Sequence, residues 1–425
     1  MVLKMLHAYH LSPSVPQRIT PYHIRMLPDI TYFARTNFHN QGTRFGIKQA
    51  DRLSHLYIIG KTGTGKTTLL ETLITSDIAH GNGLALIDPH GDLVERVAAR
   101  VPPDQQHNLV YFNVPDRTQP YGYNPLKRVT PAYRSLAASG TLEVFKKMWK
   151  ESWGQRLEHI LRNALLTLLE TPEATLIDIL RLLDDKAFRL RVARNLSNAR
   201  VRDFWLKEFA NYSYRLRAEA IVPIQNKVGA FLADPTLHRV LINPKHPIPF
   251  RRVMDSGKVL LINLAKGRIG EDASGLLGGL LLNTIGLAAF SRADTPETDR
   301  RDFYLYIDEF QNFSTLSIAN MASELRKYRV GLTLANQYLH QLEPDIRHAV
   351  LGNAGTLVSF RLGARDAPHL AREFDPVFSS TDLVNLPNYA IYLKLMIDGA
   401  PSKPFSAETL KTEELHHLLL SEPRQ

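Results

Sequence analysis

The sequence contains no cysteine, which excludes disulfide bonds, thiolate nucleophiles and cysteine-ligated zinc or iron–sulfur sites. Long apolar runs are also missing, although a membrane-spanning helix needs roughly 20 such residues. The closest stretch, residues 276–290, is interrupted by Asn283 and Thr284, and we expect it to be a buried helix. The N-terminus has no apolar core followed by a small-residue cleavage site, so no signal peptide is predicted. These absences fit a reducing compartment, and we expect a cytoplasmic protein.

What is present describes a large globular chain with a basic excess. The 425 residues are 44% hydrophobic and 22% charged, which suggests two or three domains with substantial cores. The formal net charge is +10. Residues 127–252 alone carry 23 Lys and Arg against 12 Asp and Glu, so the excess belongs to one segment. A polyanionic partner such as DNA explains it; a solvated basic face is the alternative.

One stretch carries a specific chemical signature. Residues 55–70 read HLYIIGKTGTGKTTLL, an apolar strand, a glycine-rich loop and the start of a helix. The loop fits the phosphate-binding pattern G-x-x-x-x-G-K-[ST] in the context that this pattern requires. Glycines let the backbone wrap phosphate oxygens, and the helix N-terminus adds positive potential. The predicted ATP-binding residues are Gly60, Lys61, Thr62, Gly63, Thr64, Gly65, Lys66, Thr67 and Thr68.

The rest of the chain alternates strands and helices around a helical block. Strands are predicted at 84–87, 109–112, 258–263, 303–307, 330–335 and 356–360, with an edge strand at 389–395. Helices are predicted at 67–79 and 274–291, a loop at 267–270 and a short helix after Pro404. This pattern predicts an α/β fold with a mostly parallel sheet covered on both faces. We expect an arm at 1–40, a core at 41–126 and 253–400, an all-α insertion at 127–252 and a tail at 401–425.

Polar residues at the strand ends supply the other parts that phosphoryl transfer needs. Asp308 and Glu309 follow an apolar run: Asp308 can join Thr67 in holding Mg²⁺, and Glu309 can orient or deprotonate a water. Gln337 ends the next strand and can sense the γ-phosphate, or it is an ordinary polar strand end. Asp88 and Asp92 are expected at the same edge, with Asp92 as an alternative cap of the following helix.

An arginine supplied by a neighbouring copy can stabilise the transition state of phosphoryl transfer. Arg326 and Arg361 are the two candidates for this role. Arg326 is expected on the helix after the Asp308–Glu309 strand, and Arg361 at the end of a core strand. Either could instead make a structural salt bridge. The densest basic cluster of the insertion lies elsewhere, at Arg189, Arg191, Arg194, Arg200 and Arg202.

The ordered set of motifs resembles the VirD4/TraG/TraD coupling proteins of conjugative type IV secretion, within the HerA/FtsK class of DNA-pumping ATPases. The set is GKTGTGKT at 60–67, DPHGD at 88–92, NPL at 124–126, DEFQ at 308–311, Arg326-Lys327, Gln337 and Phe360-Arg361. The resemblance implies a RecA-like core, ATP and Mg²⁺ as cofactors, and a ring hexamer that passes DNA through a central channel. It implies the catalytic set Lys66, Glu309 and Gln337, with Arg326 reaching the neighbour's nucleotide.

The sequence departs from this family in one respect and leaves three functions open. Many coupling proteins begin with transmembrane helices, and none is predicted here. We expect a soluble variant recruited to the inner membrane by a partner, a piece of a longer protein, or a protein that works away from membranes. The first hypothesis is a conjugative DNA translocase that meets a relaxase or secretion components. The alternatives are a HerA-like motor partnered with a nuclease and a secretion ATPase of the VirB4 type.

Overall fold

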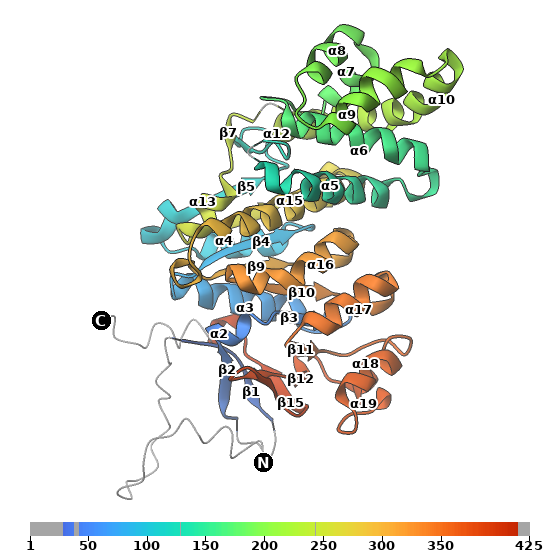
Figure 1. Cartoon of the computed structure of the whole chain (residues 1–425). Helices are drawn as coiled ribbons and strands as arrows, with labels where there is room; N and C mark the ends of the chain where they lie inside the picture. The colour runs from blue at the N-terminus through green and yellow to red at the C-terminus, as the bar shows by residue number, and fades with distance from the viewer. Residues whose placement is uncertain (1–28, 38–41, 128, 243, 415–425) are drawn as a thin grey trace, which may run out of the picture.

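The structure, a computed structural model, describes residues 29–37, 42–127, 129–242 and 244–414. A single sheet of 11 strands runs through the described part of the chain (Figure 1). In spatial order the strands are β2 (Arg44–Lys48), β1 (Ile30–Thr36), β15 (Phe405–Thr409), β12 (Ala390–Lys394), β11 (Thr356–Ser359), β3 (Leu56–Ile59), β10 (Val330–Asn336), β9 (Phe303–Ile307), β4 (Gly83–Asp88), β8 (Val259–Asn263) and β5 (Leu109–Asn113).

The part of the sheet from β11 to β5 is parallel throughout. Every residue of β3, β4, β8, β9, β10 and β11 is buried, as expected for parallel strands covered on both faces. The carboxyl ends of these strands meet at one edge of the sheet, where ligands of α/β proteins bind. The α/β fold with a mostly parallel sheet is therefore confirmed.

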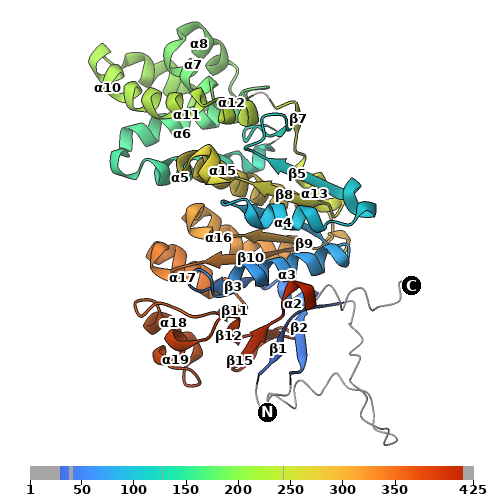
Figure 2. The ribbon, with the colours of Figure 1, turned by 180° about the vertical axis from the view of Figure 1, so that it is seen from behind.

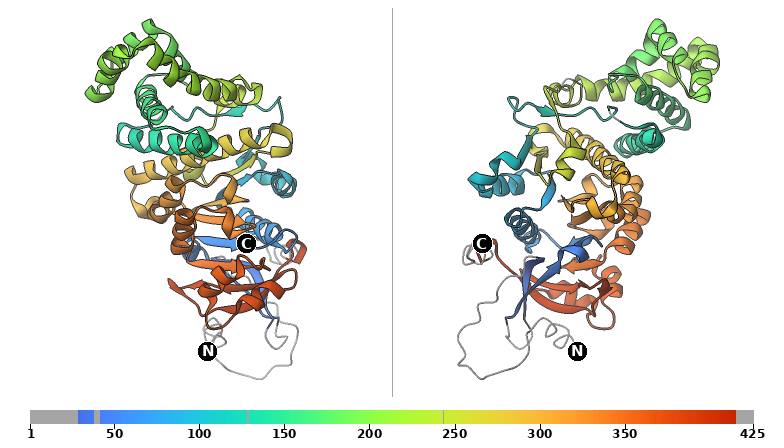
Figure 3. Two further views of the ribbon diagram at one scale, coloured as in Figure 1. Left: turned by 90° about the vertical axis from the view of Figure 1, so that its right-hand side faces the viewer. Right: turned by 60° about the vertical axis from the view of Figure 1, so that its left-hand side comes forward.

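Helices cover both faces of the sheet. The helices α3 (Lys66–Ala79) and α4 (Asp92–Arg100) lie on one face, and α15 (Glu271–Phe290), α16 (Leu316–Leu325) and α17 (Pro344–Asn353) lie on the other (Figure 3). A hydrophobic core lies on each face of the sheet, and alternate residues of a strand pack into one core or the other. Ile58 packs with the helices α3 and α4, whereas Tyr57 and Ile59 belong to the core on the other face. The sheet is thus the middle layer of three.

Four local expectations differ from the structure, and most concern the antiparallel end of the sheet. Residues 405–409 form strand β15, and the helix expected after Pro404 is seen only at 412–414 of the described chain. Strand β12 is no edge strand because it pairs with both β11 and β15. Within the expected N-terminal arm, residues 30–36 form β1, which pairs with β2 and β15; residues 1–28 and 38–41 lie outside the described residues. The expected loop at 267–270 contains a one-turn helix, α14 (Lys266–Ile269), which ends at Gly270 with a φ of +90°.

The helical insertion stacks on one end of the core (Figures 1 and 2). The chain enters and leaves it through two short paired strands, β6 (Tyr121–Gly122) and β7 (His246–Pro247). Its helices are α5 (Arg134–Met148), α6 (Gln155–Glu170), α7 (Asp178–Asp184), α8 (Lys186–Arg194), α9 (Ala199–Asp203), α10 (Tyr214–Ile224), α11 (Ala230–Ala233) and α12 (Pro235–Leu241). Helix α5 lies between α6 and α15, so it links the insertion to the core.

The remaining short elements complete the described chain. They are α2 (Gln49–Arg52), α13 (Phe250–Asp255), α18 (Ala367–Phe374), α19 (Ser380–Asn385), β13 (Met396–Ile397) and β14 (Ala400–Pro401). The predicted buried helix is α15. It belongs to the one described stretch, Glu271–Asp294, that is long and apolar enough to cross a membrane. Because 83% of its most apolar window is buried inside the protein, we interpret it as a core helix.

Candidate nucleotide-binding and hydrolysis site

The glycine-rich loop follows β3 and lies between the ends of β10 and β11, the two strands that flank β3. The Gly60 N–H donates to Asn336 O at 3.2 Å and the Lys61 N–H to Arg361 O at 2.9 Å, so β10 and β11 hold the loop. Gly65 has a φ of +121°, and a Cβ there would come within 2.9 Å of the Phe360 ring. Only glycine fits this position, because a side chain would be strained and would also collide. Gly63 has a φ of +76° with nothing near its missing Cβ.

Lys66 begins helix α3 and turns back onto the loop. Its Nζ donates to Gly60 O at 2.6 Å and to Lys61 O at 3.2 Å. The side chain is buried, and burial lowers the pKa of Lys66, while the nearby Glu309 and Asp308 act in the opposite direction. The ammonium group is therefore held at the loop by uncharged carbonyl acceptors, which the anionic oxygen of a phosphate can replace.

Threonines flank this lysine. The Thr64 hydroxyl donates to Lys61 O at 2.7 Å and braces the loop from within. Thr62 is exposed at the loop tip, whereas Thr67 and Thr68 are half-buried in the first turn of α3. The structure therefore places the whole predicted set, residues 60–68, in one loop and one helix start.

Asp308 follows β9 and is buried beside two other carboxylates. Burial raises its pKa to about 7, and the charges of Asp88 and Glu309 add to this effect. Lys66 is the nearby cation that opposes the shift. Three carboxylates against one ammonium leave excess negative charge, which suits a divalent cation with oxygen ligands. No group of three or more His, Asp or Glu side chains in the described chain forms a complete metal site, so Asp308 and the Thr67 hydroxyl would hold a Mg²⁺ ion together with phosphate and water oxygens.

Asp88 caps the start of helix α4, the role that the sequence suggested for Asp92. Its carboxylate accepts hydrogen bonds from the N–H groups of His90, Leu93 and Val94 at 2.8–3.1 Å. It thus satisfies free N–H groups at the start of α4. Asp92 is exposed as the first residue of that helix, so it neither caps α4 nor points into the carboxylate cluster described above.

Both oxygens of Glu309 are held by amide side chains. Gln337 Nε2 donates to Glu309 Oε1 at 2.8 Å, and Gln311 Nε2 donates to Glu309 Oε2 at 2.5 Å. Asn336 Nδ2 in turn donates to Gln311 Oε1 at 2.8 Å. Glu309 itself is buried and has a φ of +48°, an uncommon backbone conformation for a residue with a side chain. Strain of this kind concentrates at functional sites.

Sequence reasoning did not select Gln311 and Asn336 as site residues. Gln311 lies two residues after Glu309, where a 3-10 turn at Phe310–Asn312 returns its side chain to the carboxylate. Asn336 precedes Gln337 at the end of β10, next to β3 and β9. The available signal was the pair of amides in DEFQ and Asn336-Gln337, but only the fold shows that they converge on one carboxylate.

The two candidate arginines lie at opposite ends of the parallel strands, Arg361 at the carboxyl ends and Arg326 at the amino ends. Arg361 is beside its own phosphate loop, where its Nη2 donates to Asn388 Oδ1 at 2.9 Å and its Nη1 to Leu386 O at 3.3 Å. Arg326 is exposed at the end of α16, just before β10 begins. It lines a cavity of about 270 Å³ with His55, which precedes β3. Arg326 therefore lies at the edge opposite the loop of its own chain.

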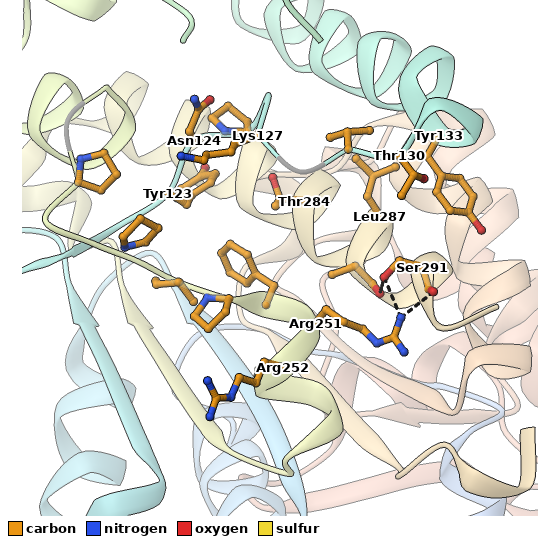
Figure 4. Close-up of a pocket in the computed structure, with 18 of the residues that line it drawn as sticks. Tyr123, Asn124, Lys127, Thr130, Tyr133, Arg251, Arg252, Thr284, Leu287 and Ser291 are labelled. Carbon is orange, nitrogen blue, oxygen red and sulfur yellow. Dashed lines mark hydrogen bonds between the residues drawn. The ribbon is translucent and has the colours of Figure 1, made fainter. Parts of the chain in front are cut away.

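A second cavity lies elsewhere in the described structure. It measures about 610 Å³ and lies where the insertion joins the core, beside α13 and α15 (Figure 4). Apolar side chains and prolines form much of its lining, and Arg251 beside it donates to Ser291 O at 2.6 Å. The cavity shares no residue with the phosphate loop or with the Asp308–Glu309 pair. It is separate from the candidate hydrolysis site.

The model of one protein family, described as Helicase HerA, central domain, matches residues 41–284 of the chain, more than half of its length. The chain belongs to this HerA family. The matched segment contains the phosphate loop, Asp88 and the helical insertion, and it ends within α15. Asp308, Glu309 and Gln337 lie beyond it. A comparison with curated proteins gives no match.

Several solved structures share the fold of this HerA-family chain. The bacterial conjugative coupling protein TrwB is 16% identical, with 87% of each chain covered and a TM-score of 0.63. A TrwB structure in complex with ADP and Mg²⁺ is 17% identical, with coverage of 87% and 88% and a TM-score of 0.62. VirB4 of Thermoanaerobacter pseudethanolicus is 14% identical, with coverage of 90% and 96% and a TM-score of 0.62. The shared fold confirms the RecA-like core and the resemblance to HerA/FtsK-class proteins.

Proposed function

We propose that this HerA-family protein is an ATPase that moves DNA. The observation that carries the proposal is the convergence of Lys66, Asp308, Glu309 and Gln337 at the carboxyl edge of one parallel sheet. These residues are the parts required to bind a nucleotide and to direct a water at its terminal phosphate. The structures of TrwB with ADP and Mg²⁺ and with ATP analogues support ATP and Mg²⁺ as cofactors.

Each residue has a distinct part in the proposed reaction. The loop N–H groups and Lys66 bind the phosphates, and Thr67 and Asp308 hold the Mg²⁺ ion. When bound, the ion neutralises phosphate charge. Glu309 orients the attacking water and accepts its proton. Burial and the two amide donors hold its carboxylate in one fixed orientation for this role. Gln337 keeps or releases its hydrogen bond to Glu309 depending on whether the γ-phosphate is present. In this way Gln337 reports hydrolysis to strand β10.

The position of Arg326 supports a ring in which nucleotide lies between copies. Because it is exposed at the edge opposite its own phosphate loop, it can reach a phosphate only in a neighbouring copy. A neighbour in head-to-tail contact has that geometry, and repeated contacts of this type close into a ring. We therefore propose a hexameric ring, with Arg326 as the arginine supplied in trans and Arg361 as a residue of its own site.

The insertion supports DNA as the moving partner. We propose residues 127–252 as a separate all-α domain on a core of 41–126 and 253–400, with a net charge of +11 from its 23 basic and 12 acidic residues. Arg191, Arg194 and Arg200 are exposed there, whereas Arg189 is buried and donates to the Leu182 and Leu183 carbonyls. The exposed set can contact phosphates; Arg189 is structural. A relaxase or a secretion component is the expected second partner, and a cytoplasmic protein recruited to the inner membrane fits this use.

Two other functions have specific support. The family model favours a HerA-like motor, for which a nuclease is the proposed partner. The likeness to VirB4, which covers 90% of this chain, favours a secretion ATPase that binds transport proteins in place of DNA. The test is the rate of ATP hydrolysis with and without single- and double-stranded DNA. We expect DNA to stimulate hydrolysis and its binding to weaken steeply with salt. A rate that ignores both kinds of DNA, with no DNA retardation in a gel, contradicts DNA translocation.

A further inference from the structure

The first helix of the insertion, α5, touches the segments that carry the hydrolysis residues. Lys147 Nζ donates to Gln311 O at 2.7 Å and to Ser314 O at 3.0 Å. One turn earlier, Glu143 Oε2 accepts from the Ser317 N–H at 2.6 Å. One turn later, Lys150 pairs with Glu343 at 2.7 Å. Glu143 and Lys147 are four residues apart and share one face of α5, whereas Lys150 lies in the 3-10 turn that follows the end of α5 at Met148.

The segment under Lys147 is the one that fixes Glu309. Gln311 accepts the Lys147 hydrogen bond with its backbone carbonyl and donates to Glu309 Oε2 with its side-chain amide. A single residue therefore stands between the insertion and the proposed general base. The same Gln311 amide accepts from Asn336, the neighbour of Gln337, so a shift of residue 311 also reaches the sensor strand.

Lys147 has no ordinary ion-pair role among the residues that the structure describes. No described carboxylate lies within 4.0 Å of it, and its hydrogen bonds go to two carbonyls. Lys147 as a whole is exposed, but its ammonium group lies against the loop, and burial of this group lowers its pKa to about 8. Glu343 opposes the shift only in part. A charge held against two carbonyls fixes their positions, because charge-assisted hydrogen bonds are stronger than neutral ones.

The rest of the insertion is joined firmly to α5. Phe145 stacks on Trp149 with ring centroids 4.9 Å apart, and Trp149 packs on Trp153. Trp153 Nε1 donates to Glu158 of α6 at 2.8 Å. Helix α6 in turn contacts α7 and α9, and α9 contacts α8. A shift of the basic helices α8 and α9 is therefore transmitted through α6 to α5, because packed interfaces pass on small shifts instead of absorbing them.

We propose that Lys147 is a positioning residue for Glu309 and the point at which the helical insertion controls hydrolysis. This inference rests on the proposed ATPase function. Lys147 holds Gln311, Gln311 holds the Glu309 carboxylate, and a polyanion bound to the insertion changes the rate by shifting α5 over this loop. The partner that acts through Lys147 is DNA; a protein partner on the same helices is an outcome that the test separates.

The test compares Lys147→Met, which keeps the stem and removes the charge, with Lys146→Met. Lys146 is the neighbour on the same helix, is exposed and lies 3.9 Å from Glu158. Steady-state ATP hydrolysis is measured with and without DNA, together with binding of a non-hydrolysable ATP analogue and the melting temperature. We expect Lys147→Met to lower kcat by about 10- to 100-fold, as small misplacements do, with KM and analogue binding within about twofold. Lys147→Arg should recover most of kcat, and Lys146→Met should match the wild type.

The outcomes separate this inference from the function it rests on. If the wild type hydrolyses ATP but ignores DNA, DNA translocation fails, and the basal kcat of Lys147→Met still decides the positioning role. If DNA stimulates Lys147→Met by the same factor as Lys146→Met, with equal kcat, the inference is wrong. It is also wrong if Lys147→Met loses analogue binding and melting temperature together and Lys147→Arg restores neither, because that result describes a structural lysine. Stimulation of the wild type by a protein partner alone would replace DNA as the controlling partner.

Discussion

Gln337, at the end of β10, donates a 2.8 Å hydrogen bond to the carboxylate of Glu309, which follows the neighbouring strand β9. With Gln311 on the other oxygen, each oxygen of the carboxylate accepts one amide hydrogen bond. Each oxygen keeps a second lone pair that can accept a hydrogen bond from a water. The structure therefore shows the Glu309 carboxylate held in one orientation, and the proposed sensor is one of the two groups that hold it.

Replacement of this carboxylate gives the first prediction. Glu309→Gln removes the proton acceptor but keeps the shape of the side chain, so ATP should still bind while turnover falls by about 100-fold or more, the usual contribution of a general base. Single-turnover hydrolysis and analogue binding measure the two effects. Glu324→Gln is the control, since Glu324 is exposed and pairs only with Lys327 among the described residues. Normal turnover in Glu309→Gln would mean that the base is another group.

The phosphate loop gives the second prediction. Lys66→Ala should abolish tight ATP binding or hydrolysis, because the ammonium group now bonded to Gly60 O is lost. The fold should persist, since Thr64 and the strand ends still hold the loop. Fluorescent-nucleotide binding and circular dichroism check the two statements. Lys403→Ala, at an exposed lysine, is the control, and a Lys66→Ala protein that hydrolyses ATP at the wild-type rate would exclude this loop as the site.

The two arginines give the third prediction, through mixed assemblies. If Arg326 acts in trans, subunits with Arg326→Ala and subunits with Lys66→Ala form some interfaces with both groups intact. Their mixture should recover activity that neither variant has alone. Arg361 lies beside its own loop, so mixtures of Arg361→Ala with Lys66→Ala should recover none. Recovery in the second mixture but not in the first would reverse the assignment.

His55 gives the fourth prediction, which concerns stability. It is buried before β3, where its Nε2 bonds to Ala322 O at 2.6 Å and its Nδ1 accepts from the Leu332 N–H. Burial lowers its pKa from 6.5 to about 4, so the folded chain binds fewer protons than the unfolded chain between these values. The contribution of His55 to the free energy of unfolding is complete above pH 6.5. It decreases as the pH is lowered through the two pKa values, by about 3 kcal/mol in total.

Denaturant unfolding at pH 7 and at pH 5 measures this loss. His55→Asn should reduce the difference between the two pH values, because asparagine does not titrate and tolerates the φ of +67° at this position. An identical pH dependence in the wild type and in His55→Asn would show that the ring is not buried in the neutral form.

The sequence predicted features that local patterns determine. The loop at 60–67 and the strands at 303–307 and 330–335 follow from short motifs and apolar runs, and the leucine stripe of α6 follows from helical period. At the antiparallel end, β12 was predicted as a strand, but β1 and β15 were missed. Strand β1 is buried along most of its length and shows no alternation, and β15 reads FSAET, without an apolar run. Lys147 carries no local signal, since it contacts residues far away in the sequence. The amides of Gln311 and Asn336 are visible in the sequence, but only the fold shows that they converge on Glu309.

The most direct test of the account is ATP hydrolysis per protomer, measured in the presence of Mg²⁺ and DNA over a range of protein concentrations, together with the mass of the species present. We predict that the specific rate falls on dilution as rings dissociate, because each site needs the neighbour's Arg326. A monomer that hydrolyses ATP at the full rate at every concentration would contradict the central claim that nucleotide is bound and cleaved between copies.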